Sequence, residues 1–200
     1  MSPRLLLRTK VYDNTVRNRG VAVAWNYGAL RMREEDADWL VVISAAMRFG
    51  APGGDDFLDH VDRSDPDAWA VEAGECPRQP GHGFGWHLIA FPRRTFDRVG
   101  DFDENFFAYY EDNDFGHRVR CAADWTPGVD PVWPKVDVDA DLAGYAHGIR
   151  LGGVISDPNK AVAYYRSKWG GPPSCEEWTT PFGEDRPLSF WRPPNRQPAR

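Results

Sequence analysis

One short apolar run constrains the fold more than any other feature of this sequence. Residues 39–43 read Trp-Leu-Val-Val-Ile, which is rich in β-branched side chains and too short for a core helix. Such a run predicts a strand that is buried on both faces. Before it, Val21, Trp25 and Met32 recur at helical spacing, which predicts a helix over residues 21–33.

The same two periodicities continue along the chain. Asp157 and Pro158 are typical of a helix start, and Gly170 is typical of the end of that helix. The other predicted elements are a strand over 5–12, a helix that is short at best after 51–54, a segment over 62–85 that is mostly loop, a strand over 86–91 closed by Pro92, a helical turn over 94–99 ended by Gly100, a helix capped by Asp112, and a half-exposed strand at Val136 and Val138. Alternating strands and helices place the chain in the α/β class, with one domain over 1–185 and a Pro- and Arg-rich tail over 186–200.

Composition narrows the classes of partner and the cellular compartment. The net charge of −6 argues against a nucleic-acid surface, which needs clustered basic residues to neutralise phosphates. The three cysteines are widely spaced and odd in number, so they predict reduced thiols rather than a disulfide framework. No apolar stretch is long enough for a secretory leader or a membrane span. These features predict a cytoplasmic protein.

Acidic and aromatic residues crowd together at one predicted helix start. Glu111, Asp112 and Asp114 follow two tyrosines and precede Phe115. One interpretation is structural, because acids in a first turn interact favourably with the helix dipole. The other is chemical, because close, partly buried carboxylates raise one another's pKa and make a general base. The nine tryptophans leave a similar choice between core packing and the lining of a sugar or base site.

Two segments of the sequence resemble a known family. Residues 100–104 (GDFDE), Phe107 and residues 111–118 (EDNDFGHR) resemble the "G-x-FDE…F…ED-x-D…R" signature of family-two inverting glycosyltransferases. Among them, bacterial rhamnosyl- and galactofuranosyl-transferases are the most similar. Residues 18–26 (NRGVAVAWN) resemble the family's "N-x-G-x-a-x-a-x-N" segment, and Asp13-Asn14 is similar to the "DN" that closes its nucleotide-binding strand.

The resemblance implies a fold, a reaction and roles for matched residues. The fold is GT-A, a mostly parallel sheet flanked by helices, with the donor at the strand ends. Asp112 matches the base that removes the acceptor hydroxyl's proton, while Glu111 and Asp114 would tune it or hold the acceptor. Arg118 would face the diphosphate or pair with Asp114. The implied donor-binding residues are Asp13, Asn14, Asn18, Gly20, Asn26 and Arg118, and the implied acceptor-binding residues are Trp86, Asp103 and Glu104.

The sequence departs from the family at the metal site. The family carries an acidic motif after the strand at 39–43, where this chain has Ser44-Ala45-Ala46. Mn²⁺ or Mg²⁺ needs oxygen ligands, normally with at least one carboxylate. Either the metal is absent, or Asp55 or Asp56 supplies the carboxylate, or the site is inactive. His147 follows a predicted strand, where the resemblance implies a histidine that contacts the metal or the diphosphate; the alternative is a loop histidine bonded to the backbone.

The resemblance also implies a shortened N-terminus, since the family has another strand–helix unit before the "DN" position. A partner protein or a second copy of the chain would complete the exposed sheet edge. We therefore expect an inverting glycosyltransferase that uses a nucleotide-sugar donor and a glycan or protein hydroxyl acceptor. A degenerate carbohydrate- or nucleotide-binding subunit of a larger glycosylation complex is the alternative. A metal-dependent hydrolase built on the acidic cluster is a third interpretation.

Overall fold

The computed structural model describes residues 9–12, 19–44, 47–49, 53–74, 85–124, 133–142 and 157–191. The helices in this part are α1 (Val21–Glu34), α2 (Gly53–Asp62), α3 (Arg93–Val99), α4 (Glu111–Ala122) and α6 (Pro158–Trp169), with 3₁₀ turns η1 (Gly85–His87) and η2 (Pro181–Gly183). The strands are β1 (Trp39–Ile43), β2 (Met47–Phe49), β3 (Val71–Ala73), β4 (Leu88–Pro92), β5 (Lys135–Val136) and β6 (Ala140–Leu142). The α/β class is therefore confirmed.

The described strands form a four-stranded sheet in the order β1-β4-β3-β5 and a separate pair, β2-β6. β4 is antiparallel to β1 and to β3, β2 is antiparallel to β6, and β3 and β5 run parallel. The prediction of a mostly parallel sheet is wrong for these strands. An apolar run identifies a strand but not its direction. Here β4 lies between β1 and β3 and runs antiparallel to both.

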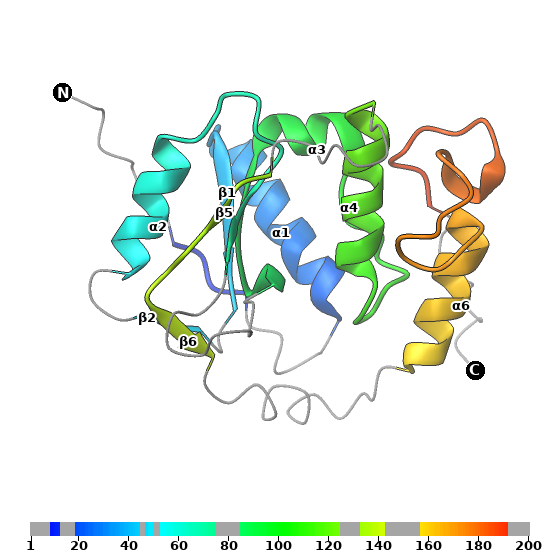
Figure 1. Ribbon diagram of the computed structural model, residues 1–200, viewed down its shortest axis with the longest axis horizontal. Helices are drawn as coiled ribbons and strands as arrows, with labels where there is room; N and C mark the ends of the chain where they lie inside the picture. The colour runs from blue at the N-terminus through cyan, green and yellow to red at the C-terminus, as the bar shows by residue number, and fades with distance from the viewer. Residues whose placement is uncertain are drawn as a thin grey trace.

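Side chains alternate along β4 and divide the core between the two faces of the sheet. Leu88 and Ala90 join a cluster with Phe57 and Val61 of α2. Ile89 and Phe91 point the other way, into a cluster formed with α1, α3 and α4. Figure 1 shows this layering, with α2 on one side of the sheet and α1 and α4 on the other. The predicted helix-flanked sheet is thus observed.

Several local predictions are confirmed because short-range chemistry determines them. The predicted helices over 21–33 and 94–99 correspond to α1 and α3, and Gly100 ends α3 with a φ of 76°. At α6 the Asp157 side chain accepts a hydrogen bond from the backbone N–H of Asn159 at 3.0 Å. Gly170 ends that helix in a left-handed conformation.

Other local predictions are wrong. The helix after residues 51–54 is the ten-residue α2. The segment 62–85 was predicted to be mostly loop; residues 63–70 agree with this, and the short strand β3 was not predicted. β1 is only partly buried, and Ile43 is 54% exposed. Residues 9–12 form no strand, while residues 5–8 lie outside the described residues. The α4 helix begins at Glu111, so Asp112 lies in its first turn and is not its cap.

A buried cluster of charged groups joins α4, α6 and the loop before α4. Lys168 Nζ donates to Asp103 Oδ2 at 2.8 Å and lies 2.7 Å from Asp114 Oδ1. On the other side of Asp114, Arg118 Nη2 lies 2.9 Å from Oδ2. All four side chains are fully buried. Burial alone would raise the pKa of Asp114, but the charges of Lys168 and Arg118 outweigh it and lower the pKa.

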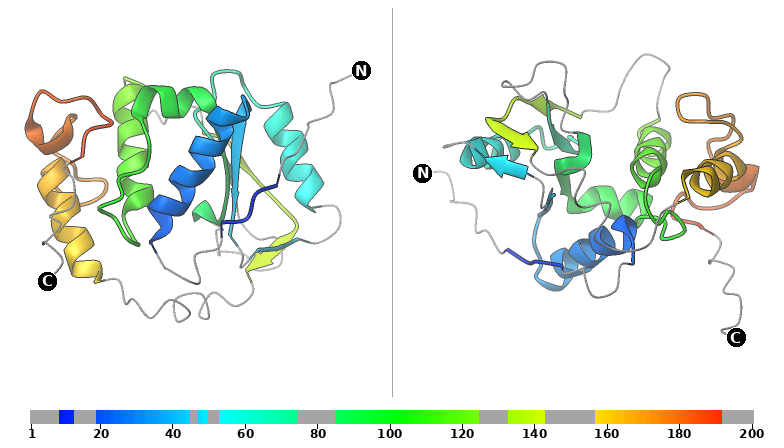
Figure 2. Two further views of the ribbon diagram at one scale, coloured as in Figure 1. Left: turned by 180° about the vertical axis from the view of Figure 1, so that it is seen from behind. Right: turned by 90° about the horizontal axis from the view of Figure 1, so that it is seen from below.

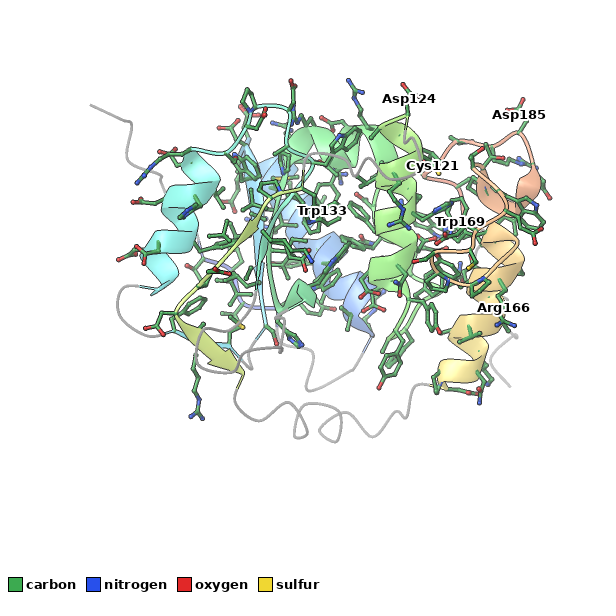
Figure 3. The ribbon with its side chains drawn as sticks, viewed as in Figure 1. Cys121, Asp124, Trp133, Arg166, Trp169 and Asp185 are labelled. Carbon is green, nitrogen blue, oxygen red and sulfur yellow. The ribbon has the colours of Figure 1, made fainter. Side chains whose placement is uncertain are left out.

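The cluster holds α6 against α4 on the side away from the sheet (Figures 1 and 2). Trp169 lies between the two helices (Figure 3), and its indole Nε1 donates to Asp114 Oδ1 at 2.8 Å. A small apolar core of Phe106, Ala161, Tyr165 and Trp169 surrounds these contacts, and Leu188 packs on it. Residue 188, within the predicted tail, is therefore in contact with the folded part.

We predict that Lys168→Met destabilises the protein by about 3–5 kcal/mol, because removing one partner of a buried ion pair leaves a carboxylate uncompensated. Urea unfolding measures this difference in the free energy of unfolding. Lys160→Met is the matched control, since Lys160 is exposed on the same helix and its replacement should change stability by about 0.5 kcal/mol or less. Adding Asp103→Asn to Lys168→Met should recover part of the loss. Equal stability of the two lysine variants would contradict this role for Lys168.

Candidate active site

The chain enters α4 through an unusual backbone turn. Tyr109 and Tyr110 have φ values of 68° and 70°, a left-handed conformation that costs non-glycine residues energy. Tyr110 is the N-cap and makes no side-chain capping bond. Two acids of the first turn, Asp112 and Asp114, instead provide negative charge at the positive end of the helix dipole.

The three carboxylates of this turn occupy different environments. Asp114 points into the buried ion cluster, and Glu111 is also buried, at 8% exposure. Asp112 is partly buried, and its Oδ1 accepts a hydrogen bond from the backbone N–H of Asn113 at 2.8 Å. Only Asp112 of the three lines a pocket beside the helix. The structure therefore separates acids that are adjacent in the sequence.

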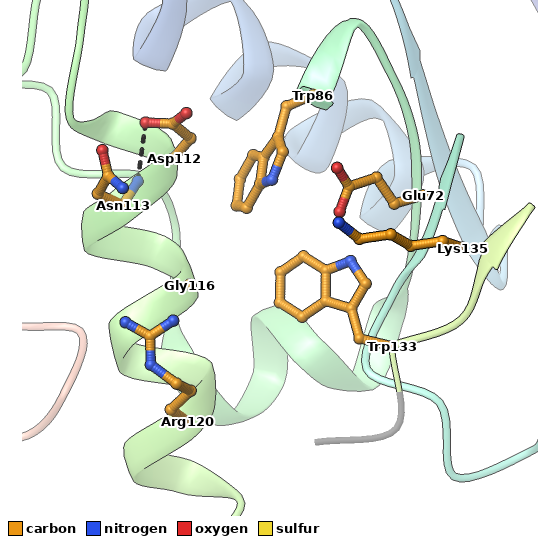
Figure 4. A pocket seen from close by; sticks show the side chains of 8 residues that line it. All are labelled: Glu72, Trp86, Asp112, Asn113, Gly116, Arg120, Trp133 and Lys135. Atoms are coloured by element: carbon orange, nitrogen blue, oxygen red, sulfur yellow. Dashed lines mark hydrogen bonds between the residues drawn. The ribbon is translucent and has the colours of Figure 1, made fainter. Parts of the chain in front are cut away.

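The pocket has a volume of about 260 Å³ and lies between α4 and the edge of the sheet that carries β3 and β5 (Figure 4). Trp86 and Trp133 face α4 across it, with ring centroids 5.6 Å apart and planes tilted by 39°. The lining residues are Glu72, Trp86, Asp112, Asn113, Gly116, Arg120, Trp133 and Lys135. Two indole rings, an amide and four charged groups thus meet in one pocket.

The apolar core holds Trp86 firmly. Its ring contacts Phe91, Phe102 and Phe115, with centroid distances between 5.4 and 6.2 Å, and stacks on Trp25 at 5.7 Å. One side of the indole therefore belongs to the core beneath α1 and α4, while the other side lines the pocket. A rigid aromatic wall of this kind fixes the orientation of a ring that packs on it.

Two carboxylates face each other across the pocket. Burial raises the pKa of Glu72 on β3; Lys135 and the nearby indole N–H of Trp133 oppose this rise, and the charge of Asp112 adds to it. Burial also raises the pKa of Asp112, although the N–H of Asn113 partly offsets the effect. A carboxylate of raised pKa binds a proton more readily, as a general base requires.

Glu111 has a strongly raised pKa. Burial, together with the charge of Asp112, raises its pKa to about 7. Its Oε2 atom is buried and has no hydrogen-bond partner among the described residues. Near neutral pH, Glu111 therefore holds a proton for much of the time and adds less than a full negative charge beside Asp112.

The other matched residues have structural contacts. Asn26 Nδ2 donates to Phe102 O at 2.9 Å and to Glu104 Oε1 at 3.1 Å, while Asn26 Oδ1 accepts from Phe102 N at 2.7 Å. Gly20 is buried beneath Phe107, whose carbonyl oxygen would lie 2.4 Å from an added Cβ. These contacts attach α1 to the loop before α4 and leave both residues outside the pocket.

Asp103, Glu104 and Arg118 also lie outside the pocket. Asp103 accepts hydrogen bonds from Lys168, Tyr164 and Asn105. Arg118 donates to the Asp114 carboxylate and to the carbonyl oxygens of Val99 and Asp101. Of its two predicted partners, the diphosphate and Asp114, this structure shows Asp114. The remaining candidates lie outside the described residues: Asp13, Asn14, Asn18 and His147.

The described residues near the position of the resembling family's acidic motif bring no carboxylates together. The backbone N–H of Ser44 donates to His87 O, while residues 45–46 are outside the described ranges. Asp55 and Asp56 are exposed on α2, which covers the opposite face of the sheet from α4. Among the described residues, no three His, Cys, Asp or Glu side chains are grouped as metal ligands.

The sequence identified Trp86 and Asp112 but not the rest of the pocket. Glu72 lies in an unpredicted strand, Lys135 is the first residue of β5, and Trp133 lies two residues before it. A usable signal was present on α4, since Asp112, Gly116 and Arg120 recur every four residues on one helical face.

Comparisons of the chain with protein-family models, with curated proteins and with solved structures give no match. No helix in the described ranges has the length and apolar character needed to cross a membrane.

We predict that Glu111→Gln changes the pH dependence of stability. A carboxyl group whose pKa is about 7 when folded and about 4.5 when unfolded favours the native state at low pH, and this contribution is lost as pH rises to 7. The wild-type protein should therefore lose about 3 kcal/mol relative to Glu111→Gln between pH 4.5 and 8, at about 1.4 kcal/mol per unit. Urea unfolding of both proteins across this range measures the difference. A difference that does not vary with pH would contradict the assignment.

Proposed function

We propose that this chain is an inverting glycosyltransferase in which Asp112 removes the proton from the acceptor hydroxyl. The supporting observation is the position of Asp112. Of the three acids in the resembling ED-x-D segment, it is the one that lines the pocket, while Asp114 is committed to Lys168 and Arg118. The residue that the resemblance names as base is thus open to a ligand.

The proposed reaction uses groups suited to single displacement. The acceptor oxygen forms a bond to the anomeric carbon of the donor while its proton passes to the Asp112 carboxylate. The bond from the anomeric carbon to the diphosphate oxygen breaks on the opposite face, and the nucleoside diphosphate leaves with that electron pair. Attack from one face and departure from the other invert the configuration. The raised pKa of Asp112 favours its acceptance of the proton.

The donor would be a nucleotide sugar, as the resemblance of residues 13–14 and 18–26 suggests. Gly20 and Asn26 would act indirectly in this proposal, because they hold α1 against the loop before α4. The acceptor would be a glycan or protein hydroxyl.

The alternative is a carbohydrate-binding subunit without catalysis. The tryptophan pair and the polar rim of the pocket favour ring binding whether or not a donor is present. The two functions differ in one respect, since only the enzyme converts a nucleotide sugar into nucleoside diphosphate and glycoside.

We predict that Asp112→Asn lowers the transfer rate by about 10²–10⁴-fold, the usual contribution of a general base. The amide retains an oxygen that accepts from the Asn113 N–H, so the fold should persist. The measurement is the rate of nucleoside diphosphate release from a panel of nucleotide sugars with added acceptors. Asp59→Asn, which changes an exposed acid on α2, is the control and should leave the rate unchanged.

Glu72→Gln tests whether Asp112 or Glu72 acts as the general base, because Glu72 is the second carboxylate in the pocket. A near-normal rate for Asp112→Asn with a large loss for Glu72→Gln would contradict the role of Asp112. Absence of turnover in the wild-type protein across the panel would favour the binding subunit.

A further inference from the structure

A second pocket, with a volume of about 270 Å³, lies where α3 and the C-terminal end of α4 meet the loop before β3. Asp124, labelled in Figure 3, shows its place at the end of α4. This pocket shares no lining residue with the pocket at Asp112, so a ligand bound here is separate from the proposed reaction. The lining residues are Asp67, Trp69, Arg94, Arg98, Ala122, Ala123 and Asp124.

Trp69 forms a fixed apolar wall of the second pocket. It is partly buried and packs on the core cluster formed by α1, α3 and α4. The Thr95 hydroxyl donates to the carbonyl oxygen of Trp69 at 2.7 Å, and Arg94 Nη2 donates to that of Ala68 at 2.5 Å. These bonds attach the loop to α3, so the indole is in position before any ligand binds.

One cation and one anion in this pocket have no ionic partner among the described residues. The guanidinium carbon of Arg98 lies 5.7 Å from the centroid of the Trp69 ring, and no described carboxylate pairs with this side chain. Asp124 directly follows the C-cap of α4, and no described cation pairs with it. Arg94 differs, because its Nη1 donates to Asp67 Oδ1 at 3.3 Å. Unpaired groups of opposite charge thus line one pocket without pairing with each other.

The surroundings of each unpaired group favour a ligand group of the opposite charge. The last carbonyl groups of a helix have no partner within it and carry partial negative charge, which favours an ammonium group beside Asp124. A guanidinium matches a carboxylate with two parallel N–H donors. Arg94 and Arg98 are also four residues apart on α3, a spacing at which like charges repel, and a bound carboxylate would offset this repulsion.

We propose that this second pocket binds a free amino acid with an apolar side chain. The ammonium group pairs with Asp124, the carboxylate pairs with Arg98, and the side chain packs on Trp69 and on the methyl groups of Ala122 and Ala123. An apolar cavity of about 150 Å³ holds benzene, so about 270 Å³ has room for a ring of that size and its charged groups. The proposal does not depend on the proposed function.

The test is isothermal titration calorimetry of the whole chain with L-phenylalanine and L-leucine. Each amino acid is compared with an amine that lacks its carboxylate and an acid that lacks its ammonium group. These are phenethylamine and 3-phenylpropionate for phenylalanine, and isoamylamine and 4-methylpentanoate for leucine. At least one amino acid should bind with a dissociation constant below about 1 mM, and its two analogues should bind at least about tenfold more weakly.

Two variants test the groups that the proposal assigns. Arg98→Gln and Asp124→Asn should each weaken binding of the amino acid at least about tenfold, or about 1.4 kcal/mol. Asp124 has a φ of 51°, and asparagine tolerates this left-handed conformation, so the fold should persist. Arg166→Gln on α6 and Asp97→Asn on α3 are the matched controls, because both residues are exposed and lie outside the pocket. Both control variants should bind like the wild type.

Three outcomes would overturn the proposal. The first is a dissociation constant above about 1 mM for both amino acids. The second is binding of an amine or acid analogue as tight as that of its amino acid, which needs no variant to fold. The third is binding that Arg98→Gln weakens and Asp124→Asn does not, because this result would identify a site for a simple anion. Asp112→Asn should leave amino acid binding unchanged, whether or not it lowers transfer.

Discussion

The position of one buried ammonium group determines much of this structure. Lys168 lies between the carboxylates of Asp103 and Asp114, and these three side chains come from α6, the loop before α4, and α4 itself. Without the cation, two carboxylates would be buried with less compensation, at a cost of several kcal/mol. Because successive helical residues are about 100° apart, Asp112 points about 200° around the helix from Asp114. Anchoring Asp114 inward therefore turns Asp112 outward, toward the pocket.

The three acids in the first turn of α4 thus differ in charge, burial and pKa. Asp114 is ionised and paired, Glu111 is buried with a pKa of about 7, and Asp112 is accessible with a raised pKa. The aromatic core supports the same site, because Trp86 packs on three phenylalanines beneath the pocket. The ion cluster at Asp114 and the aromatic core beneath Trp86 therefore both stabilise the fold and position the groups of the proposed reaction.

Some local signals in the sequence predicted local structure. The cap of α6 and the glycine that ends α3 follow from the chemistry of a few neighbouring residues. The direction of β4 and the existence of the three-residue β3 depend on pairing between distant segments, which periodicity does not report. The same limit applies to the pocket. Asp112, Gly116 and Arg120 share a readable helical face, but Glu72 and Trp133 join them only through the sheet. The buried contact of Asp103 with Lys168 is equally non-local, because it joins residues that are 65 positions apart in the sequence.

The most direct test of the central claim, that the pocket at Asp112 supports inverting transfer, is the configuration of the product. Proton NMR of the wild-type protein with α- and β-linked nucleotide sugars and lactose would report each new anomeric signal as it forms. The account predicts a glycoside whose anomeric configuration is opposite to that of the donor, formed together with nucleoside diphosphate. A product that retains the donor's configuration, or hydrolysis of the donor alone, would contradict it.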